Sequence, residues 1–327
     1  MIKKILLVSV IFIASGVVFA TNDPNPSKAK AFAVKTIIID PGHGGIDPGA
    51  RGLISTESQL ALEISMKFGK AVQAAFPDVK IIYTRTSDIL PGNLHNVQQA
   101  LRYRAELANN SKADLYISIH CNAAGQRAGG WYAKRVIGHK PKVVYSGTGK
   151  RRKKKVINTP IYESYYVENK RKGTETYIWA ADRSDDKEKF VQGEEYGENV
   201  VDTLNILDLN SPEARIRAQL YTKYFFRNSA YLAYLVEDMF KQSGRDSYGV
   251  KQRNNKGIWV LQATGMPSIL VETGFITNKE EEEYLNSDSG QAEVVNNILD
   301  AFTKYKQEME TPKGASGSRP APGTSKK

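Results

Sequence analysis

Cysteine is nearly absent from the chain, which has a single one, Cys121, among its 327 residues. One cysteine cannot form an intrachain disulfide, so a disulfide-stapled fold is excluded and the folded state must depend on a hydrophobic core. Hydrophobic residues make up 41% of the sequence, which is enough for one large domain or two small ones. The sequence contains no internal repeat.

Long hydrophobic runs are also few. The longest, at residues 5–19, follows two lysines and is too short to span a membrane. Ala20 and then a polar stretch follow it, which predicts a secretory signal peptide over residues 1–20 and a flexible leader over 21–33. No cysteine lies at the cleavage site, so we expect neither a lipid anchor nor a transmembrane anchor in the mature chain. We expect secretion across the inner membrane, to the periplasm or to the outside of the cell.

Acidic residues are missing from one stretch of the chain. The formal net charge is +11, and residues 131–155 contain ten Lys and Arg but no Asp or Glu. Four more basic residues lie in the tail, 311–327, which is rich in Gly, Ser and Pro and is predicted to be disordered. The basicity therefore belongs to one segment and one tail, which favours a local docking patch over a generally cationic protein. We expect no nucleic-acid partner.

Hydrophobic patterns in the first half of the chain alternate between those of strands and those of helices. The predicted strands lie at about 35–40, 79–84, 114–119, 174–180, 257–262 and 268–271. The predicted helices lie at about 56–76, 94–109, 213–242 and within 278–309. This order predicts an α/β fold with a mostly parallel, twisted sheet that is flanked by helices.

Histidine is scarce, with four in the chain, and two of them follow predicted strands. His43 comes after the first strand, in a loop rich in Gly and Pro, and His120 comes directly after the third. Ligands collect beyond the carboxyl ends of parallel strands, so we expect both imidazoles at one edge of the sheet. We expect His95 and His139 to be structural or solvated. The Gly-rich loop lacks the patterns of phosphate and dinucleotide loops, which excludes those functions for it.

Two glutamates could complete a metal site with these histidines. Thr56 and Gln59 have the spacing of a helix-capping box, which places Glu57 in the first turn of the helix that leaves the His43 loop. Two imidazoles and one carboxylate form a catalytic zinc site with a fourth position open for water. Glu272 follows the last predicted strand and could pass a proton from water to a leaving nitrogen. The alternatives are a helix-terminal acid for Glu57 and an ion-paired or capping acid for Glu272.

With these residues in place, the chain resembles the zinc-dependent N-acetylmuramoyl-L-alanine amidases of the amidase 3 family. The resemblance covers about residues 34–307 apart from one excursion, and it depends on the motifs DPGHGG (40–45), DPGA (47–50), LAL (60–62), YTR (83–85), SIHCNA (118–123), GTET (173–176) and MPSILVETGFITN (266–278). It implies one zinc ion per chain, held by His43, Glu57 and His120, with Glu272 as the catalytic carboxylate. It also implies a catalytic domain over residues 34–310 that cleaves peptidoglycan between N-acetylmuramic acid and the L-alanine of the stem peptide. The process served would be cell separation, wall turnover or recycling.

One insertion, at about residues 126–172, is longer and more basic than the family's pattern. It predicts a twisted hairpin. We expect its basic cluster to hold the protein on an anionic envelope polymer, through Lys150, Arg151, Arg152, Lys153, Lys154 and Lys155. The alternative is a solvated run of charge on a hairpin.

A second insertion, at about 182–212, is acidic and predicts an inserted helical segment. Some family members carry an insert whose helix blocks the zinc until a protein activator displaces it. By that resemblance Glu198, ahead of Glu194 and Glu195, is expected to cap the metal in a resting state. The alternative is an ordinary solvated acidic face.

Two other functions would use a similar set of residues. A peptidoglycan-binding or regulatory protein without turnover would have lost a ligand, and none is missing here. A zinc peptidase that cuts within the stem peptide could also use two histidines and a glutamate, although the sequence has no His-Glu-x-x-His motif to support it.

Overall fold

The computed structural model describes residues 33–180, 212–253 and 257–311. The expected signal peptide, almost all of the leader, the tail from residue 312 and the acidic insertion up to residue 211, with Glu198, lie outside these residues. Within the described part, no helix is long and apolar enough to cross a membrane.

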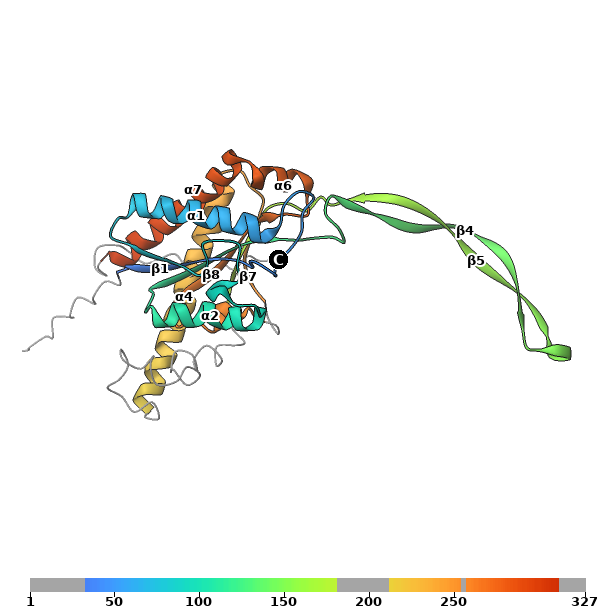
Figure 1. Cartoon of the computed structure of the whole chain (residues 1–327), viewed down its shortest axis with the longest axis horizontal. Coiled ribbons are helices and arrows are strands. Elements are labelled where there is room, and N and C mark those ends of the chain that lie inside the picture. Colours follow the sequence, from blue (N-terminus) through green and yellow to red (C-terminus); the bar gives the residue numbers. More distant parts are fainter. Residues whose placement is uncertain (1–32, 181–211, 254–256, 312–327) are drawn as a thin grey trace, which may run out of the picture.

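A six-stranded sheet forms the centre of the described part (Figure 1), with its strands in the order β2–β1–β3–β8–β6–β7. The strands are β1 (Thr36–Pro41), β2 (Lys80–Tyr83), β3 (Leu115–Asn122), β6 (Thr174–Ile178), β7 (Ser247–Gln252) and β8 (Ser268–Phe275). Strands β2, β1, β3 and β8 run parallel to one another, whereas β6 pairs antiparallel with β8 and parallel with β7. The predicted α/β fold with a mostly parallel sheet is confirmed.

Helices cover both faces of this sheet (Figure 1). They are α1 (Glu57–Ala75), α2 (Val97–Asn110), α4 (Pro212–Gln242), α5 (Trp259–Gln262), α6 (Lys279–Asn286) and α7 (Asp288–Glu310). Ile37 and Ile39 of β1 belong to the core shared with α1, α7 and the second half of α4, whereas Ile38 belongs to the core shared with α2 and α5. Side chains alternate between the faces of a strand, so a β1 that is covered on both sides is apolar at every one of these positions.

Helix α1 begins at the predicted capping box. The Thr56 hydroxyl accepts a hydrogen bond from the backbone N–H of Gln59 at 3.4 Å, and the Gln59 side chain accepts one from the backbone N–H of Thr56 at 3.1 Å. Leu60 and Ile64 are fully buried, as their helical spacing predicts. Glu57 is therefore fixed as the first residue of the helix.

The local structure departs from the predictions in several places. The strand expected at 257–262 contains the short helix α5, because a run of only a few apolar residues carries no period that separates strand from helix. Strand β7 has no predicted counterpart. Strands β3 and β8 extend beyond their predicted ends, so His120 and Glu272 lie within strands and not after them.

The predicted hairpin is confirmed as a separate two-stranded antiparallel ribbon of β4 (Gly130–Ser146) and β5 (Lys153–Glu168). Figure 1 shows it extending from the body as a long twisted arm, and we call residues 130–168 the arm. At its base, the N–H of Asn169 donates to the carbonyl of Gly129 at 3.0 Å. The N–H of Gly129 donates to the carbonyl of Thr277 at 2.9 Å, two residues after β8. The arm is thus attached to the same part of the body that carries Glu272.

Candidate metal centre and active site

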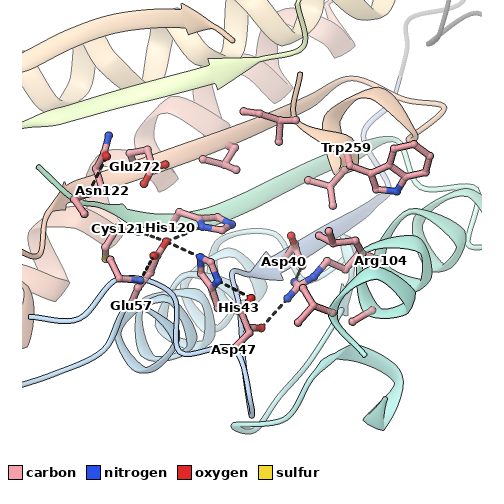
Figure 2. Close-up of a pocket in the computed structure, with 18 of the residues that line it drawn as sticks. Asp40, His43, Asp47, Glu57, Arg104, His120, Cys121, Asn122, Trp259 and Glu272 are labelled. Atoms are coloured by element: carbon pink, nitrogen blue, oxygen red, sulfur yellow. Dashed lines mark hydrogen bonds and ion pairs between the residues drawn. The ribbon is translucent and has the colours of Figure 1, made fainter. Parts of the chain in front are cut away.

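One pocket of about 390 Å³ brings together the four residues proposed from the sequence as a site (Figure 2). His43 follows β1, Glu57 opens α1, His120 lies on β3 and Glu272 lies on β8. Strands β1, β3 and β8 are parallel neighbours, so their carboxyl ends meet at this edge of the sheet. Other residues that line the pocket include Asp40, Asp47, Arg104, Asn122, Arg253, Trp259 and Leu270.

Two buried arginines hold the loop that carries His43. Arg85 donates to the carbonyl of Gly42 at 2.6 Å, and Arg104 donates to the carbonyl of His43 itself at 2.7 Å. Arg104 also forms a buried ion pair with Asp40 at the end of β1. His43 adopts a φ of 57°, which a residue with a side chain rarely does without support from its surroundings. The two guanidinium groups supply that support, and Arg104 had no predicted role.

Glu57 lies between the two imidazoles. Its Oε1 atom is 3.1 Å from Nε2 of His43 and 2.8 Å from Nδ1 of His120. The other carboxylate oxygen accepts the N–H of Ala50 at 2.8 Å, which fixes its orientation. One ligand atom from each of the three residues lies within 4.8 Å of the other two. Two imidazole nitrogens and one carboxylate oxygen that face an open pocket fit a zinc ion with one position left for water.

The hydrogen bonds between Glu57 and the imidazoles shift the pKa values of His43 and Glu57 in opposite directions. Burial lowers the pKa of His43, but the hydrogen bonds and charges of Glu57 and Asp47 outweigh it and raise the pKa to about 9. Burial also opposes ionisation of Glu57, yet its hydrogen bonds with His120 and His43 hold the pKa of Glu57 well below its usual value. The imidazolium of His43 and the carboxylate of Glu57 therefore form an ion pair, in which a divalent cation could take the place of the proton.

Asp47 is a site residue with no predicted role. Its Oδ2 atom lies 2.9 Å from Nδ1 of His43, so Nδ1 faces Asp47 and Nε2 faces Glu57. A carboxylate on the far nitrogen commonly fixes the tautomer and the orientation of a metal-binding histidine. The signal available in the sequence was an acid four residues after a histidine in one glycine-rich loop.

Glu272 borders the pocket beside the three clustered side chains. It is opposite His120 in the register of β3 and β8. Its Oε2 atom is buried and has no hydrogen-bond partner in the described part of the chain. Burial, with the charges of Glu57 and Glu175, raises the pKa of Glu272 well above its usual value. A carboxyl group that is drawn toward its protonated form at the edge of a pocket suits proton transfer.

Glu272 lies next to a polar network around Glu175 that was not predicted from the sequence. Glu175 of β6 is only 4% exposed and is opposite Glu272 in the register of β6 and β8. Glu175 accepts hydrogen bonds from the Tyr177 hydroxyl at 2.9 Å and from the Asn122 side chain. Because two negative charges on opposite residues repel each other, this arrangement favours a proton on Glu272. No spacing in the sequence signals this pair, because only the pairing of β6 with β8 brings it together.

Cys121 and the basic residues of the arm lie outside this cluster. Cys121 is buried, and its Sγ atom lies 3.4 Å from the Thr273 hydroxyl. The basic residues 150–155 lie at the exposed tip of the arm and do not line the pocket.

Comparison with known proteins identifies similar sequences. Residues 37–304 match the profile of a protein family described as N-acetylmuramoyl-L-alanine amidase. The chain is 26% identical over 289 residues to the N-acetylmuramoyl-L-alanine amidase AmiC of Escherichia coli O6:H1, covering 88% of this chain and 56% of that protein. It is 25% identical over 297 residues to AmiA of Escherichia coli K12, covering 90% of this chain and 84% of that protein. The chain spans about half the length of several of the curated relatives it matches.

The fold is similar to that of a solved amidase. The CwlD amidase from Clostridioides difficile, determined in complex with the GerS lipoprotein, has a TM-score of 0.52 and 21% sequence identity. The similarity covers 84% of this chain and 99% of that chain. At this level of identity the likeness supports the fold alone.

Proposed function

We propose that this chain, which belongs to the N-acetylmuramoyl-L-alanine amidase family, is a zinc-dependent hydrolase of peptidoglycan. The bond it cleaves is the amide between the lactyl group of N-acetylmuramic acid and the L-alanine of the stem peptide. Water is added across that bond, so the products are a lactyl carboxylate and the amino group of L-alanine. The observation that carries the proposal is the meeting of His43, Glu57, His120 and Glu272 around one pocket. Residues 34–310 are proposed as the catalytic domain.

The metal site uses three atoms that already face one another. Nε2 of His43, Oε1 of Glu57 and Nδ1 of His120 would hold the zinc ion. When bound, zinc supplies Lewis acidity that activates water near neutral pH. Asp47 keeps the Nδ1 proton of His43 directed away from the metal site, so that Nε2 presents its lone pair.

Glu272 carries the proton in this proposal. Its unpaired, buried Oε2 atom accepts a proton from the attacking water and delivers it to the nitrogen of L-alanine as the amide bond breaks. The raised pKa of Glu272 suits the second step, because the protonated acid must persist long enough to donate. Glu175, paired with Glu272 across the sheet, helps to set that property.

The cellular setting follows from the substrate and from residues 1–20. Export through that signal peptide would place the enzyme in the periplasm or outside the cell, where peptidoglycan lies. Cell separation, wall turnover or recycling are the processes that such an enzyme would serve. An activator protein that displaces an inhibitory helix, with Glu198 on the metal, remains part of the proposal, although Glu198 lies outside the described residues. A solved amidase of similar fold was determined in complex with a lipoprotein, which is in keeping with a protein partner.

The basic tip of the arm is proposed to bind an anionic envelope polymer. Residues 150–155 are all basic and exposed, and they lie at the end of the arm, away from the ion pairs of the body. Deletion of residues 148–156 is expected to weaken binding to isolated cell walls at low salt and to remove the salt dependence of that binding. Binding that is unchanged and insensitive to salt would contradict this part of the proposal.

Mass spectrometry of digested peptidoglycan tests the main activity. The purified protein, incubated with cell walls and zinc, is expected to release intact stem peptides that begin with L-alanine and to leave glycan strands without peptides. A chelator should abolish the release, and added zinc should restore it. Peptides shortened from within would identify a peptidase, and cell-wall binding without any release would identify a binding protein.

A further inference from the structure

The arm carries a bare aromatic face. In the register of β4 and β5, Tyr132 is opposite Tyr166 and Val136 is opposite Tyr162, and these pairs are separated by an even number of residues. All four side chains therefore lie on one face of the ribbon. They are 75%, 55%, 50% and 57% exposed, in the order Tyr132, Tyr166, Val136 and Tyr162. We call these four residues the aromatic face.

The opposite face of the same segment is different. There the guanidinium group of Arg135 lies 5.6 Å from the centre of the Tyr165 ring, and Tyr165 is 43% exposed, less than any residue of the aromatic face. Arg135 in turn forms an ion pair with Glu163 at 2.6 Å. The aromatic face has no such cover in the described part of the chain. Isolated two-stranded hairpins are only marginally stable in water, and contiguous exposed apolar surface usually marks a binding site.

The charge of the arm indicates the chemistry of its partner. Between the aromatic face and the tip lie Lys140 and Lys142, and the tip adds residues 150–155, with no acid over residues 131–162. A partner should therefore be anionic as well as able to cover flat aromatic rings. A second copy of the arm would bring like charges together, which disfavours self-association.

The shape of the arm favours a linear polymer over a membrane. The loop at the tip, Ser-Gly-Thr-Gly followed by basic residues at 146–152, has no apolar side chain that could insert into a bilayer. The three tyrosines of the aromatic face lie farther back, toward the base of the ribbon, and Tyr145, near the tip, lies under the guanidinium group of Arg152. A strand of 17 residues spans about 55 Å. Such a surface fits an extended chain that lies along it.

The base of the arm is continuous with the edge of the sheet that carries the pocket. Residues 123–129 lead from β3, which carries His120, directly into β4. Ala124 is fixed to Thr277 by a hydrogen bond of 2.9 Å from its N–H to the Thr277 hydroxyl. The arm therefore begins at the sheet edge that carries the pocket, where a polymer that is bound for cleavage would lie.

We propose that the aromatic face of the arm is a second binding site for the peptidoglycan substrate itself, at a distance from the cleaved bond. This proposal rests on the proposed amidase activity. The sugar rings of the glycan strand present flat C–H faces that stack on Tyr132, Tyr162 and Tyr166. The carboxylates of neighbouring stem peptides pair with the lysines of the arm. The arm is thus a built-in cell-wall-binding element that favours long, insoluble substrate over short fragments.

Two variants and a matched control test this second site. The triple substitution Tyr132→Ala, Tyr162→Ala and Tyr166→Ala removes the aromatic face. The substitution Tyr165→Ala removes a tyrosine from the opposite face of the same ribbon. A third protein lacks residues 130–168, replaced by a two-residue turn, which the hydrogen bond between Asn169 and Gly129 allows without moving the body.

Each protein is measured on two substrates. The triple variant and the deletion are expected to bind intact cell walls at least about tenfold more weakly, in a pelleting assay with chelator present, because several stacked aromatic contacts are lost. Their rate on intact cell walls should fall to match, whereas their rate on a soluble disaccharide-peptide fragment should equal that of the unmodified protein. Tyr165→Ala should resemble the unmodified protein on both substrates.

Equal rates on intact walls for all four proteins would overturn the proposal, and so would an equal loss on both substrates. Capture of the unmodified protein by phosphatidylglycerol vesicles, lost in the triple variant while wall binding persists, would assign the face to lipid and would also overturn it. Failure of both the unmodified protein and its Glu198→Ala variant to cleave the soluble fragment would instead refute the amidase activity, so the two failures are distinct.

Discussion

Replacement of Glu272 by Gln separates proton transfer from metal binding. The amide side chain keeps the size of the carboxylate but cannot accept a proton from water. Glu272 is not one of the three residues whose ligand atoms cluster, so zinc binding should survive the change. A positioned acid–base group contributes about 10²–10⁴-fold to rate, so the barrier should rise by about 3 to 5 kcal/mol.

The assay combines metal content with turnover. Zinc per chain is measured by mass spectrometry, and release of stem peptides is followed by chromatography under single-turnover conditions. The expected result is an unchanged zinc content with a rate about 10²–10⁴-fold lower. An activity within tenfold of the unmodified protein would show that Glu272 is not the proton carrier. Loss of zinc in parallel with activity would show that Glu272 acts on the metal site instead.

The Glu272→Gln variant should also differ from the unmodified protein in how its free energy of unfolding depends on pH. A variant that was merely misfolded would not show this difference. Burial and the charges of Glu57 and Glu175 raise the pKa of Glu272 well above 4.5, so the metal-free native state favours the protonated acid. The contribution of this preference to the free energy of unfolding is fully present below pH 4.5. It is lost as the pH rises through the raised pKa of Glu272. Gln cannot ionise, so the free energy of unfolding of the chelated variant, relative to the unmodified protein, should increase as the pH rises above 4.5. A difference that stays constant with pH would refute this account of the burial of Glu272.

Three further predictions concern the residues around the metal site. Asp47→Ala removes the 2.9 Å contact with His43 and should weaken zinc affinity by about 10- to 100-fold in a competition titration, with Asp47→Asn closer to the unmodified protein. The pKa of His43 is about 9 and zinc requires the neutral imidazole, so zinc affinity should rise with pH up to about 9. An affinity that is flat between pH 6.5 and 9 would contradict the ion pair between His43 and Glu57. The Glu282 carboxylate accepts hydrogen bonds from the backbone N–H groups of Leu53, Ile54 and Ser55. Glu282→Gln should therefore lower the free energy of unfolding by about 2 to 3 kcal/mol. It should also reduce the zinc content. A Glu282→Gln protein of full stability and full zinc content would show that the loop is held by other contacts.

The elements that the sequence predicted well are those with a long, one-sided pattern. Helix α1 has a capping box at Thr56 and Gln59 and an apolar face that repeats over the full length of the helix, so its start and its buried side were both predictable. The positions of His43 and His120 at one edge of the sheet followed from parallel topology. Helix α5 was missed because it has only four residues. Strand β7 was missed because its sequence, SYGVKQ, has no apolar run and its two apolar side chains, Tyr248 and Val250, lie on an exposed side.

The parts of the site that the sequence did not predict are contacts between distant segments. Glu175 is close to Glu272 only because β6 joins the sheet antiparallel to β8. Arg104 reaches the carbonyl of His43 from the middle of α2, a separation of 61 residues that no local pattern reveals. Asp47, in contrast, could have been predicted. It lies four residues from His43, and a metal-binding histidine commonly needs a carboxylate to orient its imidazole.

One buried side chain connects the two halves of the proposed mechanism. Glu282 lies on α6, which follows directly after β8, the strand that carries Glu272. It is 1% exposed, and it holds residues 53–55, which lead into Glu57 at the start of α1. The segment that positions the proton carrier therefore also positions a metal ligand, so a shift of β8 relative to α1 would change the metal site and the proton carrier together.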